Sequence, residues 1–374
     1  MTIYILVTVV VLISITTCII LNQKQFGKYP SGERLERIKR SPNYRNGAFL
    51  NKHDTPVMTE GVGYPQVMMT FLFGKKIRVT PEGEIPSVKT DLLHLDRKKD
   101  ILVWFGHSSY FMQIDGKRIL VDPVLSGYAS PFSFTVKAFK GADRYTGEDI
   151  PDIDYLFISH DHWDHLDYET IMKLKPRIGK VICGLGVGED FEYWGFDRKS
   201  IIEMDWNEQV IPDQGFIINT IPARHFSGRG FKRNQTLWTS YVLLTPTMKI
   251  FIGGDGGYDT HFAETGKKFG PFDLAILENG QYDKNWKYIH LLPADLLKAF
   301  NDLHAKSLLT VHHSKFALGN HPWDEPMIKV TASARELHIP LLTPKIGEVV
   351  NLENTKNPRR LKGDKELHAR LFSF

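Results

Sequence analysis

Four potential metal ligands occupy six consecutive positions of this chain, directly after a short apolar stretch that has the composition of a buried strand. The stretch is 154–158, and the ligands that follow it in the order H-x-H-x-D-H are His160, His162, Asp164 and His165. In an extended loop, side chains two residues apart point to the same side, so the first two histidines can bind one ion. A turn after them lets the aspartate and the third histidine face a second ion. The pattern therefore predicts two metal sites in one loop.

Composition limits what else can hold a metal. The chain has 374 residues, 42% hydrophobic and 24% charged, which is ordinary for a globular protein. It has 47 Lys and Arg against 43 Asp and Glu, and this near balance argues against a general polyanion binder, so we expect no nucleic acid partner. Two cysteines, Cys18 and Cys183, cannot build a disulfide framework or a cysteine-based zinc finger. Any metal must be bound by histidines and carboxylates.

The first 23 residues carry the membrane signal. Residues 2–23 contain no charged side chain, and the apolar run 3–21 would span roughly 28 Å as a helix, close to the ~30 Å of a bilayer core. No basic residue precedes the run and no small-x-small cleavage site follows it, which favours an uncleaved single-pass anchor over a signal peptide. Basic side chains follow the run within 24–40, so the positive-inside rule predicts a cytoplasmic catalytic domain.

Two further segments are basic and are expected to lie outside the catalytic domain. We assign 24–79 as a juxtamembrane and cap segment and 351–374 as a C-terminal tail. Within the first, the charged stretch 33–40 suits either a short helix resting on anionic headgroups or a solvated linker. The apolar stretch 67–73 is expected to pack in a core, with lipid contact or an acyl-chain entrance as the alternative.

The rest of the chain alternates between strand and helix signals. The segment 101–122 has two apolar runs joined at Asp115-Gly116, which predicts an antiparallel hairpin. An amphipathic pattern predicts helices over 293–303 and 324–337. Further strands are expected at 155–158, 181–183, 216–221, 241–244, 249–252 and 274–277.

These motifs together resemble a known family. The H-x-H-x-D-H loop after a strand resembles the metallo-β-lactamase fold, an αββα sandwich of the α+β class with two metal sites at one edge. The runs at 103–131, 225–226, 253–259 and 311–326 are similar to N-acylphosphatidylethanolamine-hydrolysing phospholipase D and its bacterial relatives. The resemblance covers roughly residues 80–350, which we assign as the hydrolase domain. The same outline occurs in an ascorbate-6-phosphate lactonase-like branch.

The resemblance implies a set of seven ligands for two zinc ions. One ion would take His160, His162 and His225, the other would take Asp164, His165 and His312, and Asp255 would bridge both. His313 stands beside His312, and because side chains alternate in extended backbone only one of them can face the metal; we choose His312. Iron or manganese could replace zinc in one site, since histidine and aspartate accept all three metals.

The resemblance also implies roles for residues around the ions. As catalytic residues, Asp164 and Asp255 would orient the attacking water, and His290 would assist the leaving group or contact the headgroup. Asp122 would orient a ligating imidazole. His107 would lie beside the metals or support the fold, and His321 would either follow the family pattern or cap a helix.

The expected protein is a membrane-anchored dinuclear zinc hydrolase, a phosphodiesterase of phospholipase D type acting on N-acylphosphatidylethanolamine-like lipids. Its expected partners are the membrane and a phospholipid or other phosphodiester substrate, and a homodimer stays open. One alternative is a zinc-dependent lactonase or phosphodiesterase for a small soluble metabolite. Another is a non-catalytic zinc-binding membrane scaffold.

Overall fold

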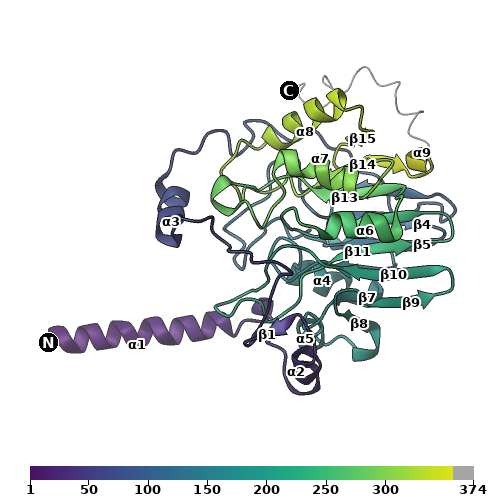
Figure 1. Ribbon diagram of the computed structural model, residues 1–374. Coiled ribbons are helices and arrows are strands. Elements are labelled where there is room, and N and C mark those ends of the chain that lie inside the picture. The colour runs from purple at the N-terminus through teal and green to yellow at the C-terminus, as the bar shows by residue number, and fades with distance from the viewer. Residues whose placement is uncertain (357–374) are drawn as a thin grey trace.

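Two seven-stranded sheets face each other and carry helices on their outer faces (Figure 1). The structure, a computed structural model, describes residues 1–356, except for the side chains of Phe71 and Leu72. Most of the predicted tail, from 357 onward, lies outside the described residues. The architecture confirms the predicted αββα sandwich.

The first sheet has the strand order β16-β3-β4-β5-β6-β7-β8. Its strands are β3 (Ile101–Trp104), β4 (Tyr110–Ile114), β5 (Lys117–Val121), β6 (Ile153–Ile158), β7 (Ile178–Gly184), β8 (Ile201–Met204) and β16 (Val349–Asn351). Strands β4 and β5 form the predicted hairpin, with Ile114 opposite Lys117. Both turn residues have positive φ, 50° at Asp115 and 77° at Gly116, as a two-residue turn matched to strand twist requires.

The second sheet has the order β15-β14-β13-β12-β11-β10-β9. Its strands are β9 (Gln209–Asp213), β10 (Phe216–Ile221), β11 (Ser240–Leu244), β12 (Lys249–Ile252), β13 (Leu274–Glu278), β14 (Leu308–Val311) and β15 (Leu341–Leu342). All six further strands expected from the sequence are present as parts of β6, β7 and β10 to β13. Strands β12, β13 and β14 run parallel, so their carboxyl ends meet at one edge of the sheet.

Alternating side chains explain how the layers assemble. Inward-facing residues such as Met112 and Tyr155 of the first sheet pack against Ile250 and Ile276 of the second. Apolar faces of α4 (Tyr168–Leu174) and α5 (Gly188–Tyr193) pack on the outside of the first sheet. Helices α6 (His261–Phe269), α7 (Pro293–Asp302) and α8 (Glu325–Glu336) cover the second sheet. Both predicted helices, α7 and α8, are confirmed.

Shorter elements complete the described chain. A two-stranded ribbon consists of β1 (Tyr44–Arg45) and β2 (Ala48–Phe49), and α9 (Glu353–Lys356) ends the described part. Single 3₁₀ turns are η1 (Lys24–Phe26), η2 (Gly147–Asp149), η3 (Lys175–Arg177), η4 (Arg198–Ser200) and η5 (Lys284–Trp286).

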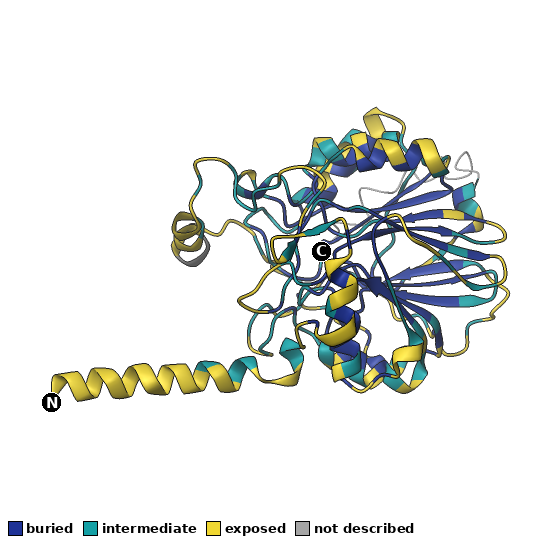
Figure 2. Cartoon of the chain, turned by 60° about the horizontal axis from the view of Figure 1, so that its bottom comes forward, coloured by how far each residue is buried: buried dark blue, intermediate teal, exposed yellow. Residues whose placement is uncertain are grey.

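Helix α1 (Thr2–Leu21) leaves the body as an isolated, mostly exposed rod (Figure 2). None of its described residues is buried, and its best window has a mean hydropathy of 2.8. It is long and apolar enough to cross a membrane, although a signal sequence near the N-terminus passes the same test. The chain is fixed to the body directly after it, because Trp194 Nε1 donates to Lys24 O (2.9 Å) and Arg229 Nε donates to Gln25 O (2.9 Å).

Helix α2 (Gly32–Lys39) packs on the body through a buried arginine. The Arg34 side chain is 5% exposed and donates to Glu189 Oε2 (2.6 Å) and Glu203 Oε2 (2.7 Å). Ile38 is fully buried beside Leu185. The helix is present as predicted, and because it packs on the body the solvated-linker alternative is wrong; its contact with anionic headgroups stays a prediction. The sequence could not show that Arg34 faces inward, because its carboxylate partners lie more than 150 residues away.

Replacing Arg34 by alanine is expected to destabilise the protein by about 3–5 kcal/mol, because it leaves buried carboxylates without their counter-charge. Denaturant unfolding in detergent measures the change. The matched control is Arg37→Ala, whose side chain is 43% exposed and whose partner is the exposed Glu208; its expected cost is below about 1 kcal/mol. Equal costs for the two variants would contradict the buried ion pair.

Helix α3 (Tyr64–Phe73) projects away from the body on the same side as α1 in both views (Figures 1 and 2). Met68 and Met69 are each 57% exposed and Phe73 is 75% exposed. The expectation of core packing is therefore wrong. Apolar composition predicts that a helix seeks an apolar environment, but it does not specify that this environment lies within the same chain.

Candidate metal centre

Histidines and carboxylates from loops at one edge of the sandwich converge. They follow β3 (His107), β5 (Asp122), β6 (160–165), β10 (His225), β12 (Asp255) and β14 (His312), and His290 precedes α7. All seven predicted ligands fall into groups whose potential ligand atoms lie within 4.8 Å of one another.

The first group contains three histidines. His162 Nδ1 lies 2.8 Å from His160 Nε2 and 3.3 Å from His225 Nε2. His160 and His225 are buried, whereas His162 is partly exposed. Three imidazole nitrogens that approach this closely have the arrangement of ligands around one ion.

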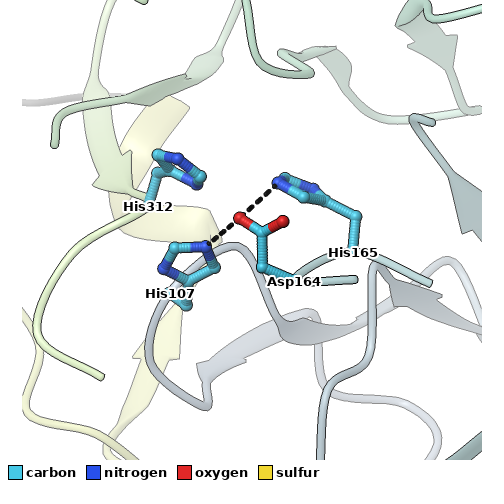
Figure 3. A group of neighbouring side chains, drawn as sticks. All are labelled: His107, Asp164, His165 and His312. Atoms are coloured by element: carbon cyan, nitrogen blue, oxygen red, sulfur yellow. Dashed lines mark hydrogen bonds and ion pairs between the residues drawn. The ribbon is translucent and has the colours of Figure 1, made fainter. Parts of the chain in front are cut away.

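The second group contains Asp164, His165 and His312 together with His107 (Figure 3). Asp164 Oδ2 lies 2.9 Å from His107 Nε2 and 3.5 Å from His165 Nε2. The H-x-H-x-D-H loop thus sends its first two ligands to one group and its last two to the other, as the spacing predicts.

Asp255 lies between the two groups. Its Oδ2 atom is 3.1 Å from His165 Nε2, 3.2 Å from His312 Nε2 and 4.0 Å from His225 Nε2. Burial by itself would raise the pKa of this carboxyl, but the surrounding histidines, led by His165, lower it well below its ordinary value. A buried carboxylate in this position can be shared by two cations.

The outer nitrogens of the histidines are held by protein groups. His225 Nδ1 donates to Ile289 O (2.8 Å), which as a carbonyl can only accept, so Nε2 presents its lone pair to the group. His165 Nδ1 lies 2.8 Å from Asp122 Oδ2, and His312 Nδ1 lies 3.0 Å from Ser108 Oγ. His160 Nδ1 lies 3.0 Å from Ser159 Oγ. Such outer partners fix ring orientation in metal sites.

Electrostatics favours the neutral ligand form of three of these histidines and the protonated form of His165. Burial lowers the pKa of His160, His225 and His312 well below the ordinary value, which keeps their imidazoles neutral. Burial also opposes the charged form of His165, but Asp255 and neighbouring carboxylates raise its pKa well above the ordinary value. Neutral imidazoles mixed with ionised carboxylates are the donors that zinc, iron and manganese accept, so the residues present fit a metal centre.

Backbone strain accompanies the site. His107, Asp122 and His312 have φ values of 52°, 41° and 67°, in the left-handed region that residues other than glycine rarely adopt. The amide of His312 donates to His107 O (3.0 Å), and that of His107 donates to His313 O (2.9 Å). The two loops therefore hold each other in strained conformations, as is common where geometry serves function.

Replacing Asp122 by asparagine is expected to weaken metal binding by about 10–100-fold, because this side chain orients His165. Its carboxylate also accepts from Ser159 N (2.8 Å) and Ser159 Oγ (2.6 Å), bonds that an asparagine oxygen can retain in part. Competition with a chromophoric chelator measures the affinity. Asp152→Asn on the loop before β6 serves as the control, and unchanged affinity in Asp122→Asn would contradict the orienting role.

Two histidines near the site in sequence have other contacts. His321 Nε2 accepts from Gln281 N (2.7 Å), and its ring packs against Tyr282. These contacts suit support of the fold, and a role at the site stays a prediction. His313 is turned toward Thr310 and Trp104, which leaves His312 as the member of the pair that joins the cluster.

The sequence analysis missed Glu278, which lies at the end of β13 and is 1% exposed. Its Oε2 atom lies 2.6 Å from His290 Nδ1. Burial by itself would lower the pKa of His290, but the Glu278 charge outweighs it and raises that pKa to about 9. The sequence did contain a signal for this residue, namely an acidic side chain directly after the apolar run 274–277. If that strand is buried, the charge needs a partner.

A sandwich of this topology with a histidine and aspartate cluster at its edge defines the metallo-β-lactamase class of metal-dependent hydrolases. The chain belongs to the β-lactamase superfamily: residues 117–313 match the model described as beta-lactamase superfamily domain. By fold, it resembles a metallo hydrolase from the archaeon Ignicoccus hospitalis, with a TM-score of 0.51 and 21% identity over 67% of this chain and 97% of that one.

Proteins of similar sequence indicate which metal-dependent hydrolases the chain is related to. An uncharacterized protein of Mycobacterium tuberculosis is 34% identical over 84% of this chain and 85% of its own length. N-acyl-phosphatidylethanolamine-hydrolyzing phospholipase D 1 of Caenorhabditis elegans is 30% identical over 67% of this chain and 77% of its own length. The resemblance inferred from the motifs is confirmed, and the protein is a metallo-hydrolase related to that phospholipase D.

Proposed function

We propose that the protein is a membrane-anchored dinuclear zinc phosphodiesterase that cleaves N-acylphosphatidylethanolamine-like lipids in the manner of a phospholipase D. The observation that carries the proposal is the position of Asp255, whose Oδ2 atom lies within 4.0 Å of histidines from both groups. The activity in the name of the C. elegans relative supports the substrate class.

In this proposal, His160, His162 and His225 would hold one ion, Asp164, His165 and His312 would hold the other, and Asp255 would serve both. Bound zinc would supply Lewis acidity for the phosphoryl oxygen and make water nucleophilic at neutral pH. The same set would accept iron or manganese in one position.

The chain's own residues supply orientation and a proton. Asp164 and Asp255 orient the attacking water through its hydrogens. His290 lies beside them, with Nδ1 4.0 Å from Asp255 Oδ2 and its ring 5.3 Å from that of His312. The water oxygen bonds to phosphorus and its proton passes to solvent, while the bond from phosphorus to the leaving oxygen breaks. That oxygen keeps the electron pair and takes a proton from His290 Nε2, which solvent then restores.

Membrane attachment supports a lipid substrate. Helix α1 has the length and hydropathy of a span, and α3 presents exposed Met68, Met69 and Phe73 on the same side of the body. We propose that α1 is a single-pass anchor, that the catalytic domain faces the cytoplasm, and that α3 contacts lipid. Apolar side chains that enter the headgroup region bring a lipid enzyme to its substrate.

Hydrolysis of dispersed N-acylphosphatidylethanolamine, compared with a soluble diester and a soluble lactone, tests the proposal. The double variant Met68→Asp with Phe73→Asp is expected to slow the lipid reaction and to leave the soluble diester reaction unchanged. The control is Ile328→Asp, which changes an exposed apolar residue on α8. Turnover of only soluble substrates would favour the metabolite hydrolase, and no turnover with full zinc would favour the scaffold.

A further inference from the structure

We propose that Glu278 is a positioning residue that fixes His290 for the reaction and ties it to the turn that carries Asp255. The inference rests on the proposed function for what His290 does, but the geometry of Glu278 stands by itself. Both oxygens of this buried carboxylate are used, and they make three contacts with two separate segments of the site.

One carboxylate oxygen holds two backbone amides in place. Glu278 Oε1 accepts from Gly256 N (2.8 Å) and from Leu291 N (3.1 Å). These amides belong to the residues directly after Asp255 and His290. A Cβ atom at Gly256 would lie 2.8 Å from Arg224 N, so this turn has no room for a side chain at position 256. One carboxylate thus sets the distance between a predicted metal ligand and a predicted catalytic histidine.

The other carboxylate oxygen orients the imidazole ring of His290. Oε2 lies 2.6 Å from His290 Nδ1, whereas Asp255 Oδ2 lies 4.0 Å from the same nitrogen, which is too far for a hydrogen bond. Because Oε1 already accepts from two backbone amides, the carboxylate acts as an acceptor here, and His290 Nδ1 donates to Oε2. Nε2 is then the nitrogen available for chemistry, and the His290 side chain keeps 12% of its surface exposed.

The variant Glu278→Gln separates orientation from support of the fold. Its amide oxygen can still accept from both backbone amides, but its NH₂ group then faces His290 and donates to Nδ1. Nδ1 must then accept, so the ring stays in place but carries a hydrogen on Nε2 alone. This neutral imidazole is a weaker acid than the wild-type ring, which donates from Nδ1 to Glu278 and from Nε2 to the leaving oxygen. Zinc content and KM are expected to stay unchanged, and kcat for the lipid is expected to fall about 10–100-fold.

Two measurements make the test specific. A diester with a p-nitrophenolate leaving group needs no proton, so Glu278→Gln should slow it far less than the lipid. In a His290→Ala background, Glu278→Gln should cause no further loss, because the carboxylate acts through the missing ring. Glu325→Gln, which changes a carboxylate bonded to Tyr282 and Lys329 outside the site, is the matched control.

A spectroscopic measurement is independent of turnover. Long-range ¹H–¹⁵N spectra of zinc-loaded, ¹⁵N-histidine-labelled protein, with His290 assigned from the His290→Ala spectrum, should show hydrogens on Nδ1 and Nε2 in the wild type and on Nε2 alone in Glu278→Gln. A hydrogen kept on Nδ1 in Glu278→Gln, loss of zinc, or a full additional loss in the His290→Ala background would overturn the proposal. A wild type that cleaves no diester would end the proposed function, and the spectra would still decide the role of Glu278.

Discussion

Replacing Asp255 by alanine should lower phosphodiester hydrolysis by at least about 10³-fold, because Lewis-acid stabilisation by bound metal is worth several kcal/mol and each 1.36 kcal/mol is a factor of ten. The side chain is 3% exposed, and its Oδ2 atom lies within 4.0 Å of histidines of both groups. Metal content should fall together with the rate. Atomic spectroscopy of purified protein and initial-rate measurements on the same preparation check both expectations.

Controls separate loss of metal from loss of fold. Asp255→Asn keeps the size of the side chain and should show the same catalytic loss with near-normal unfolding. Asp259→Ala changes a nearby carboxylate that contacts His53 and lies outside the cluster, so its metal content should be normal. A fully active, fully metallated Asp255→Ala protein would contradict the shared position of this side chain.

Removing the metals with a chelator should abolish activity and lower the melting temperature, and adding zinc should restore both. A ligand that binds only the folded state stabilises it by about 4 kcal/mol when its free concentration is a thousand times its dissociation constant. In this site the effect has a structural reason, since His162 Nδ1 lies 2.8 Å from His160 Nε2 and 3.3 Å from His225 Nε2, at the position proposed for one ion. Thermal unfolding followed by circular dichroism, with and without chelator, measures the shift.

Restoration with single metals extends this experiment. Zinc, manganese and ferrous iron are added separately to the chelated protein, and the two-site proposal expects two equivalents per chain for full activity. Restoration at one equivalent, or a chelated protein with an unchanged rate and melting temperature, would contradict a dinuclear centre.

Features set by neighbouring residues could be predicted from the sequence. The hairpin depends on Asp115-Gly116, whose positive φ values are a local requirement of the turn. Buried strands leave continuous apolar runs, which is why β10 and β12 have the predicted bounds. The H-x-H-x-D-H loop likewise carries its geometry in its spacing. His225 and Asp255 have no such local pattern, and only the family resemblance pointed to them.

The features that could not be predicted depend on distant partners. Arg34 stands in a charged stretch that is typical of a solvent-exposed helix. It is buried because the fold brings Glu189 and Glu203 to it. Glu278 ends a strand, where a charged residue is ordinary. Its importance depends on His290, which a later part of the chain brings into contact with its carboxylate. The exposed α3 lacked any signal for the direction in which its apolar side chains would point.

Arg229 connects the junction after α1 to the metal loop. Its guanidinium donates to Gln25 O, to Asp161 O (2.8 Å) and to Leu166 O (2.7 Å), and lies 3.9 Å from the centre of the Trp163 ring. With α1 in a bilayer, as proposed, these contacts would tether the catalytic edge close to the lipid surface. A lipid substrate of the proposed class would then arrive by lateral diffusion within one leaflet, and bilayer thickness or curvature would alter the rate without any change at the ligands.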